Sequence, residues 1–169
     1  MNPARAILVV VGTLALQTTL ARFLPSGMAA VDLVLVGVVY IALTSGPVTG
    51  LLAGTLAGLA QDALSSGTIG IGGLAKTLVG YAAGRVGTQL IVAAALPRFV
   101  VFFGGTVLHQ IVFIGLYRLL DLRQFASPVV TVMEQSASNA VLGVAVFQVV
   151  ELLPGALERR RMAKTRLRR

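Results

Sequence analysis

Two opposite charges flank a glycine-rich turn in an otherwise apolar part of the chain. Asp62 and Lys76 lie in the stretch GLAQDALSSGTIGIGGLAKTLVGY, residues 58–81. A charge at the centre of a membrane helix costs about 2.5–3.5 kcal/mol on insertion scales, so two such charges need a physical reason. Both lie within a few residues of the turn, whose glycines permit tight backbone. Three alternatives stay open: an ion pair, separate contacts with water or a backbone N–H, and contact with a binding partner.

A second set of polar side chains lies near the start of the last apolar segment. Gln135 and Asn139 are four residues apart and share one helix face, and Glu134 and Ser138 form the adjacent row. Such groups should face the interior of a helix bundle or an aqueous cavity. They indicate either hydrogen bonds between helices, worth about 0.6 kcal/mol each, or a pocket for a small ligand or ion. His109 can join this cluster or bond a backbone carbonyl.

Known catalytic and metal-binding patterns are missing from the sequence. There is no Cys and only one His, which excludes thiol chemistry and a multi-histidine metal site. The nucleophile elbow, the H-E-x-x-H zinc motif, the phosphate-binding loop and the dinucleotide-binding glycine motif are also missing. Two further acids, Asp32 and Glu151, lie at the ends of apolar segments, where solvated charge is the ordinary interpretation. The sequence therefore predicts a protein that is not an enzyme and holds no cofactor or metal.

The composition indicates that lipid surrounds most of the chain. Of its 169 residues, 56% are hydrophobic and 12% are charged, and the mean hydropathy is +0.89. A soluble domain has about 25% charged residues. We predict an all-α integral membrane protein, a compact bundle of six transmembrane helices. These helices are expected over residues 6–24, 31–44, 47–64, 72–95, 97–120 and 128–153, with prolines at the joints: Pro25, Pro47, Pro97, Pro128 and Pro154.

Glycines spaced by four residues run along the third segment and recur in the fourth. In lipid, helices associate largely through close backbone approach, which glycine permits. Each step of four advances about 40° round a helix of 3.6 residues per turn, so the stripe winds and different neighbours can use different parts of it. The pattern predicts helix packing within the chain or, alternatively, a face that receives a partner helix. The glycines are Gly46, Gly50, Gly54 and Gly58, followed by Gly80 and Gly84.

The distribution of basic residues predicts the orientation. With both termini in the cytoplasm, nine basic residues flank the segments on the inner side and three on the outer side, as the positive-inside rule requires. The first segment is expected to stay uncleaved, because no small-residue cleavage site follows it. Residues 1–156 form the predicted transmembrane domain, and residues 157–169 form a basic cytoplasmic tail.

The basic tail is predicted to contact anionic lipid, at about 1 kcal/mol per basic residue near the surface. No motif for binding nucleic acid accompanies it, so no nucleic acid partner is expected. Seven of the fourteen Lys and Arg residues lie in this tail: Arg159, Arg160, Arg161, Lys164, Arg166, Arg168 and Arg169.

The stretch GLLAGTLAGLAQDALSSGTIGIGGLAKTLVGYAAG, residues 50–84, resembles the glycine-led motif of the rod-shape-determining protein MreD family. The chain length, the six segments and the basic end also fit that family. Lys76 does not belong to the family pattern, which leaves Asp62 as the stronger functional candidate of the two charges. The matching positions are Gly54, Gly58, Asp62, Gly67, Gly70, Gly80 and Tyr81.

The resemblance implies a non-enzymatic scaffold of the elongation machinery in the inner membrane of rod-shaped bacteria. It implies association with MreC, and with RodA, its partner transpeptidase and MreB, in lateral peptidoglycan synthesis. The glycine face and residues 65–73 are expected to lie near MreC. The family is also similar in fold to the substrate-binding subunits of energy-coupling-factor vitamin transporters. A small-molecule-binding transporter subunit is therefore the alternative function, and the polar residues 134–139 are its support in the sequence.

Overall fold

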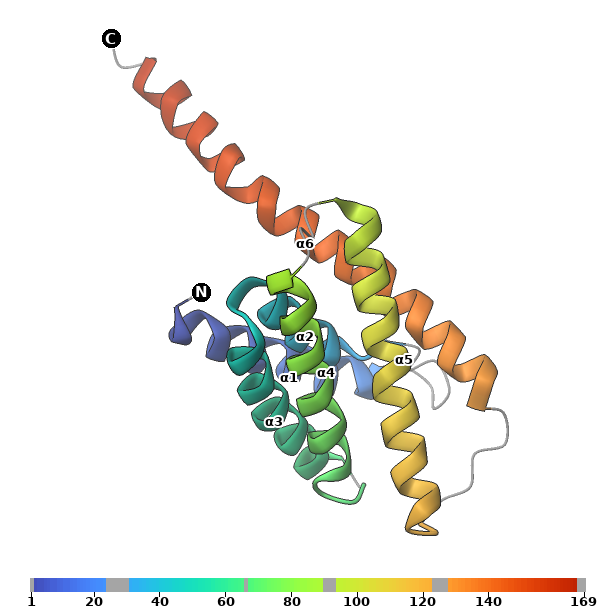
Figure 1. The fold of residues 1–169 in the computed structure, drawn as a ribbon. Coiled ribbons are helices and arrows are strands. Elements are labelled where there is room, and N and C mark those ends of the chain that lie inside the picture. Colours follow the sequence, from blue (N-terminus) through green and yellow to red (C-terminus); the bar gives the residue numbers. More distant parts are fainter. Residues whose placement is uncertain (1, 24–30, 66, 90–93, 123–127, 167–169) are drawn as a thin grey trace.

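The computed structural model describes residues 2–23, 31–65, 67–89, 94–122 and 128–166, with side chains over 2–21 in the first helix and 129–151 in the last. Within these ranges the backbone forms six helices and no strand (Figure 1). The predicted all-helical fold with six helices is confirmed. The helices are α1 (Pro3–Phe23), α2 (Leu33–Ser45), α3 (Pro47–Leu64), α4 (Ile71–Gln89), α5 (Ala95–Leu119) and α6 (Pro128–Arg166).

The outer surface of the bundle is apolar, as expected of a protein solvated by lipid. Large side chains such as Leu56 and Ile111 are 64% and 63% exposed. Among the described residues, three stretches are long and apolar enough to cross a membrane: Pro3–Ala21, Ala95–Leu119 and Val129–Glu151. α2 is also apolar but has only 13 residues. At 1.5 Å per residue it is about 20 Å long, against about 30 Å for the hydrocarbon core.

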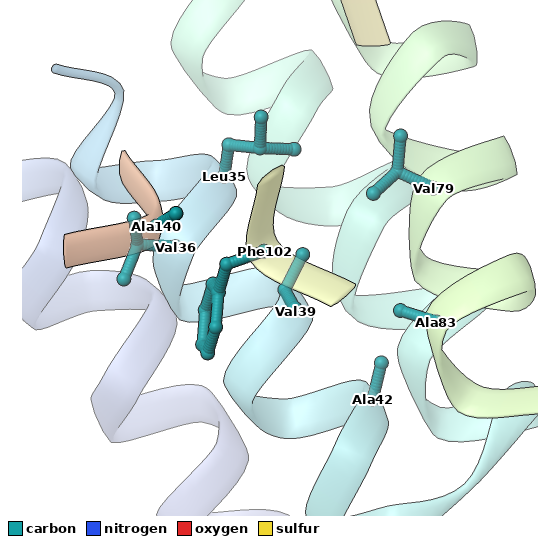
Figure 2. Close-up of a cluster of buried hydrophobic side chains, with 8 residues drawn as sticks. All are labelled: Leu35, Val36, Val39, Ala42, Val79, Ala83, Phe102 and Ala140. Atoms are coloured by element: carbon teal, nitrogen blue, oxygen red, sulfur yellow. The ribbon is translucent and has the colours of Figure 1, made fainter. Parts of the chain in front are cut away.

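α2 is the central helix of the bundle and contacts all five other helices. Its run of valine, leucine and isoleucine has no polar face, which is typical of a helix that is buried on all sides. Accordingly, eight of its thirteen residues are buried. Its side chains form the main hydrophobic core with α4, α5 and α6 (Figure 2): Leu35, Val36, Val39, Ala42, Val79, Ala83, Phe102 and Ala140.

α3 and α4 are antiparallel and pack with their backbones in contact. A Cβ atom at Gly58 would lie 2.6 Å from the Cα atom of Gly73, and one at Gly54 would overlap the carbonyl of Lys76. Each step of four along α3 is matched by a step of four back along α4. The facing positions are Gly46 with Gly84, Gly50 with Gly80, Gly54 with Lys76, and Gly58 with Gly72.

The nearest neighbour of each glycine of the α3 stripe is therefore α4, and at Gly50 α2 also touches the stripe, through Ala42. Its winding does not distribute it among several neighbours, contrary to expectation. The reason is that a four-residue repeat exceeds the 3.6-residue turn, so two helices that keep contact along it wind round one another. Gly46 also makes the turn into α3, with a φ of 86° that favours glycine.

Two predicted helix ends are wrong. The fourth helix, described to Gln89, does not extend to residue 95, because Ala95 begins α5. Hydropathy does not separate these segments, and Pro97 fits the first turn of α5, where its missing N–H is not needed. α6 continues through Pro154 to Arg166. A proline removes one helical hydrogen bond, whereas most of the residues that follow it are strong helix formers.

α6 therefore runs on from the bundle into the basic tail as one helix, away from the other five helices (Figure 1). Before it leaves, Arg98 of α5 donates two hydrogen bonds to Glu151, at 2.6 and 2.8 Å. The same guanidinium lies 4.2 Å from the ring centre of Phe147. Glu151 is thus paired and not simply solvated as expected. The boundary between residues 156 and 157 stays a prediction, because the helix crosses it without a break.

Candidate functional site

A cavity of about 430 Å³ lies at the end of the bundle that carries the α3–α4 turn. Polar and charged side chains dominate its walls, in contrast to the apolar core below it. It is lined by Asp32, Gln61, Asp62, Ser65, Gly67, Gly72, Lys76, His109, Gln110, Phe113, Tyr117 and Gln135. The lining comes from the start of α2 and from α3, α4, α5 and α6. We take this cavity as the candidate functional site.

The shortness of α2 explains why a cavity forms here. α2 ends and α3 begins at the same turn, around Gly46, yet α3 has 18 residues and α2 has 13. With a rise of 1.5 Å per residue, α3 therefore reaches about 7 Å beyond the start of α2. The first residues of the central helix therefore lie deeper in the bundle than the ends of the neighbouring helices. Asp32, immediately before α2, lines the cavity.

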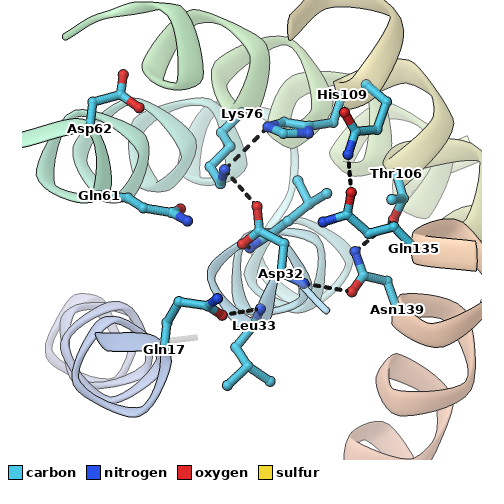
Figure 3. A network of polar contacts seen from close by, with 12 residues as sticks. Gln17, Asp32, Leu33, Gln61, Asp62, Lys76, Thr106, His109, Gln135 and Asn139 are labelled. Atoms are coloured by element: carbon cyan, nitrogen blue, oxygen red, sulfur yellow. Dashed lines mark hydrogen bonds and ion pairs between the residues drawn. The ribbon is translucent and has the colours of Figure 1, made fainter. Parts of the chain in front are cut away.

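Lys76 joins three helices beside this sunken end. Its Nζ atom lies 2.8 Å from Asp32 Oδ2 and 3.2 Å from His109 Nε2 (Figure 3). The side chains of Lys76 and Asp32 are only 4% and 8% exposed, so this is a buried ion pair. The expected alternative of a pair between Lys76 and Asp62 is wrong. Asp32, expected to be a solvated charge at a helix end, is the acid that Lys76 meets.

The N-terminus of α2 is capped by side chains from distant parts of the chain. The first N–H groups of a helix have no partner within it, and in lipid each unpaired group costs several kcal/mol. Asp32 Oδ1 accepts the N–H of Leu35 at 2.9 Å, and Asn139 Oδ1 accepts that of Asp32 at 2.9 Å. Gln17 Oε1 accepts the N–H of Leu33 at 2.8 Å. Helices α1 and α6 thus hold the floor of the cavity in place.

Asp62 lies on the opposite side of the cavity, and it forms no ion pair with a basic side chain among the described residues. Its Oδ2 atom accepts the N–H groups of Gly70 at 2.8 Å and Gly73 at 3.0 Å. Of the three alternatives for Asp62, contact with backbone N–H groups is the one observed. Tyr117 adds a contact from α5, because its hydroxyl oxygen accepts the N–H of Thr68 at 3.2 Å. The turn between α3 and α4 is therefore tied down where it borders the cavity.

The polar residues of α6 divide between the cavity, the core and the surface. Gln135 lines the cavity and accepts a hydrogen bond from Gln110. Asn139 is fully buried and donates to Thr106 Oγ1 at 3.2 Å. Glu134 is exposed and does not line the cavity, so it departs from the expectation for this cluster. His109 lines the same cavity as Gln135, and its Nε2 atom meets Lys76 rather than a backbone carbonyl.

Two buried polar atoms of the cavity lining lack a hydrogen-bond partner among the described residues: Gln61 Oε1 and His109 Nδ1. An ammonium group has only donors, so His109 Nε2 accepts from Lys76 and Nδ1 carries the ring proton. Two residues of the lining thus carry one unused acceptor and one unused donor, both buried behind the cavity surface, so a guest meets them only after these side chains shift. A buried polar atom without a partner loses about 1–3 kcal/mol, so both atoms favour a guest with complementary groups.

Several of these residues carried no strong signal in the sequence. Asp32 carried a signal, because it comes directly before a segment that is apolar on all sides. Such a helix is buried in the centre of a bundle, and an acid at its start is buried with it. Gln61 and Tyr117 had no signal, and the sequence did not indicate Lys76 as the partner of His109, since these roles depend on how helices distant in the sequence meet. No group of three or more metal-binding side chains occurs in the parts of the chain that the structure describes.

The remaining predicted positions lie away from the cavity. Gly46, Gly50, Gly54, Gly58, Gly80 and Gly84 lie at the α3–α4 contact. Of the basic tail, Arg159, Arg160, Arg161, Lys164 and Arg166 belong to the backbone of α6, and Arg168 and Arg169 fall outside the described residues.

Fold and cavity together define an all-helical membrane protein with a polar cavity over a short central helix. The family model described as rod shape-determining protein MreD matches residues 4–153 of the 169-residue chain. The chain belongs to the MreD family and has a role in determining rod shape. No curated protein and no solved structure matches it significantly. The likeness to energy-coupling-factor subunits is therefore not confirmed.

Proposed function

We propose that this protein is a non-enzymatic scaffold of the elongation machinery that binds MreC and supports lateral peptidoglycan synthesis. In this proposal it crosses the bacterial inner membrane six times, with both termini in the cytoplasm. The cavity then opens toward the outer face, where peptidoglycan is built. RodA, its partner transpeptidase and MreB join in a larger complex, and the basic tail lies on anionic lipid at the inner face.

The observation that carries the proposal is the unused donor and acceptor in the cavity. The glycine stripe, the other surface expected near MreC, is covered by α4. The part of the expected contact that remains open is the turn after α3, which borders the cavity through Ser65, Gly67 and Gly72. A peptide group presents both an N–H and a C=O. A peptide segment thus carries the donor that Gln61 Oε1 lacks and the acceptor that His109 Nδ1 lacks, which favours a segment of MreC as the guest.

The substitution Gln61→Leu tests this assignment. Replacing an unpaired buried acceptor by an apolar group should leave stability unchanged or raise it. Binding of MreC should weaken, since the acceptor for its N–H is lost. We expect wild-type helical content and melting temperature, reduced copurification of MreC, and rounded cells when the variant replaces the wild-type protein. Equal copurification of MreC with the variant and the wild type would refute the role of the cavity.

Photo-crosslinking locates the contact directly. A benzophenone side chain at Ser65, which is exposed at the cavity rim, is expected to capture MreC. The matched control is Leu56, which lies on the lipid-exposed face of α3, at 64% exposure, and should not capture MreC.

Depletion of the protein should turn rods into spheres. Unchanged rod shape after depletion would count against the function as a whole.

A small-molecule-binding membrane subunit is the second candidate, favoured by the same buried unpartnered atoms. This function predicts that a small molecule copurifies with the protein and raises its melting temperature. Mass spectrometry of the denatured, purified protein distinguishes the two functions, since the scaffold needs no such molecule. Gln61→Leu should then release the compound without affecting MreC.

A further inference from the structure

A second hollow, the α5–α6 groove, lies on the lipid-exposed side of the bundle and has the opposite character to the cavity. Its volume is about 360 Å³, and almost all of its surface is apolar. No acid is among its lining residues within the described chain. Val107 and Gln110 lie toward its deep end and Arg118 at its other end, with Gly115 between them. The apolar walls are formed by Val107, Ile111, Ile114, Val129, Val132 and Met133.

The length of the groove matches one leaflet of a bilayer. Along α5 it extends from Val107 to Arg118, which is about 16 Å at 1.5 Å per residue. Half of a hydrocarbon core of about 30 Å is about 15 Å. Arg118 lies in the last turn of α5, one residue before the end of the apolar stretch Ala95–Leu119. The groove therefore runs from the membrane surface to about the midplane.

The width of the groove favours a single hydrocarbon chain. At Gly115 a Cβ atom would meet nothing within 4 Å, so the missing side chain leaves open space. A helix with its side chains is about 10–12 Å across. A space of about 360 Å³ spread over this length holds a narrow chain but not a second helix.

Arg118 gives the groove a charged end. Its side chain is exposed, and it has no ion pair or side-chain hydrogen bond with any described residue. A guanidinium forms bidentate hydrogen bonds with phosphate. We infer that the groove binds an anionic glycerophospholipid, with one acyl chain between α5 and α6 and its phosphate on Arg118. This inference does not depend on MreC binding.

Native mass spectrometry of the full-length protein in detergent tests the site, with dioleoylphosphatidylglycerol and dioleoylphosphatidylcholine as probes. The wild-type protein should retain one phosphatidylglycerol in preference to phosphatidylcholine. Arg118→Gln should weaken phosphatidylglycerol binding about tenfold, because the charge-assisted hydrogen bonds are lost. Gly115→Leu should abolish it by filling the groove.

The matched control is Gly104→Leu, which also adds a side chain to open space on α5 but outside the groove. It should bind lipid as the wild-type protein does, and helical circular dichroism should show that all variants fold. Equal lipid retention by Gly115→Leu and the wild type would overturn the site. So would equal affinity for both lipids with no effect of Arg118→Gln, or capture of a partner's helix by a crosslinker at Val132.

Discussion

Lys76 is a buried cation that serves two other helices at once. It brings the carboxylate before α2 and the imidazole of α5 to α4, at 2.8 and 3.2 Å. Removing an ion pair from water costs several kcal/mol per ion, and the attraction offsets this only when the geometry is good and other hydrogen bonds are made. The Asp32 carboxylate accepts one such bond, from the N–H of Leu35, and Asn139 accepts the backbone N–H of Asp32. The pair therefore positions the floor of the cavity more than it adds net stability.

Loss of one partner of this pair should be costly, and loss of both should be mild. Lys76→Met leaves the Asp32 carboxylate buried and unpaired, which should lower the free energy of unfolding by about 3–5 kcal/mol. The double variant Asp32→Asn with Lys76→Met should recover most of that loss, because the amide oxygen still caps Leu35. Unfolding in detergent, followed by circular dichroism, measures both. Additive effects of the two substitutions would contradict the pairing.

Asp62 should act through its two backbone hydrogen bonds. Asp62→Ala leaves the N–H groups of Gly70 and Gly73 unpaired and should destabilise the protein by about 2–4 kcal/mol. Asp62→Asn keeps an acceptor oxygen and should lose clearly less. The same unfolding measurement compares them. If Asp62→Asn were as stable as the wild type but unable to maintain rod shape, the carboxylate would have a role beyond capping.

At the scale of helices, the α3–α4 pair is a rigid support for the cavity. Backbone contact along the whole glycine stripe fixes the two helices relative to one another, and a hydrogen bond between Thr55 and Thr77 at 2.8 Å adds a polar link. The cavity residues Gln61, Asp62 and Lys76 are all carried by this pair. Their mutual positions thus depend on how closely the two backbones approach.

A single methyl group in this contact should be disruptive. In Gly54→Ala the new Cβ atom would overlap the carbonyl of Lys76, and the resulting shift should lower stability by about 1–3 kcal/mol. Gly104→Ala is the matched control, since its Cβ atom meets nothing within 4 Å. It should be neutral or stabilising by up to about 1 kcal/mol, from helix propensity. Equal melting temperatures for the two variants would refute close α3–α4 packing.

At the scale of the whole molecule, the two ends of the bundle differ in character. One end holds the polar cavity and Arg118, and the other holds the pair of Arg98 with Glu151 and the exit of α6 toward the basic tail. The distribution of basic residues predicts which end faces outward, and this prediction is open to a direct test.

Because the chain has no Cys, single introduced cysteines report topology without background. Ser65→Cys at the cavity rim should react with a membrane-impermeant maleimide while the inner membrane is intact. Thr165→Cys in the tail should react only after the membrane is opened. This result follows if both termini are cytoplasmic. Labelling of the tail in cells with an intact membrane would reverse the orientation and place the cavity on the cytoplasmic side.

Composition and spacing along the chain were enough to predict six helices, a lipid surrounding and the glycine contact. These properties depend on neighbouring residues in one helix, and hydropathy and small-residue spacing report them directly. The match of residues 47–64 to α3 shows how well this works where prolines and glycines mark the ends. The predicted helix end at Pro154 was wrong, because the residues after this proline are strong helix formers and the helix continues through them.

The partner of Lys76 could not be read from the chain, because Asp62 is nearer in sequence and Asp32 is nearer in space. Which acid a buried cation meets depends on the depth of each helix. The 13-residue α2 places Asp32 below the surface, while Asp62 is already occupied by two N–H groups. The cavity follows from the same cause. The local sequence pattern thus determines where the helices form. The relative lengths and the packing of helices distant in sequence determine where the cavity lies and which residues line it.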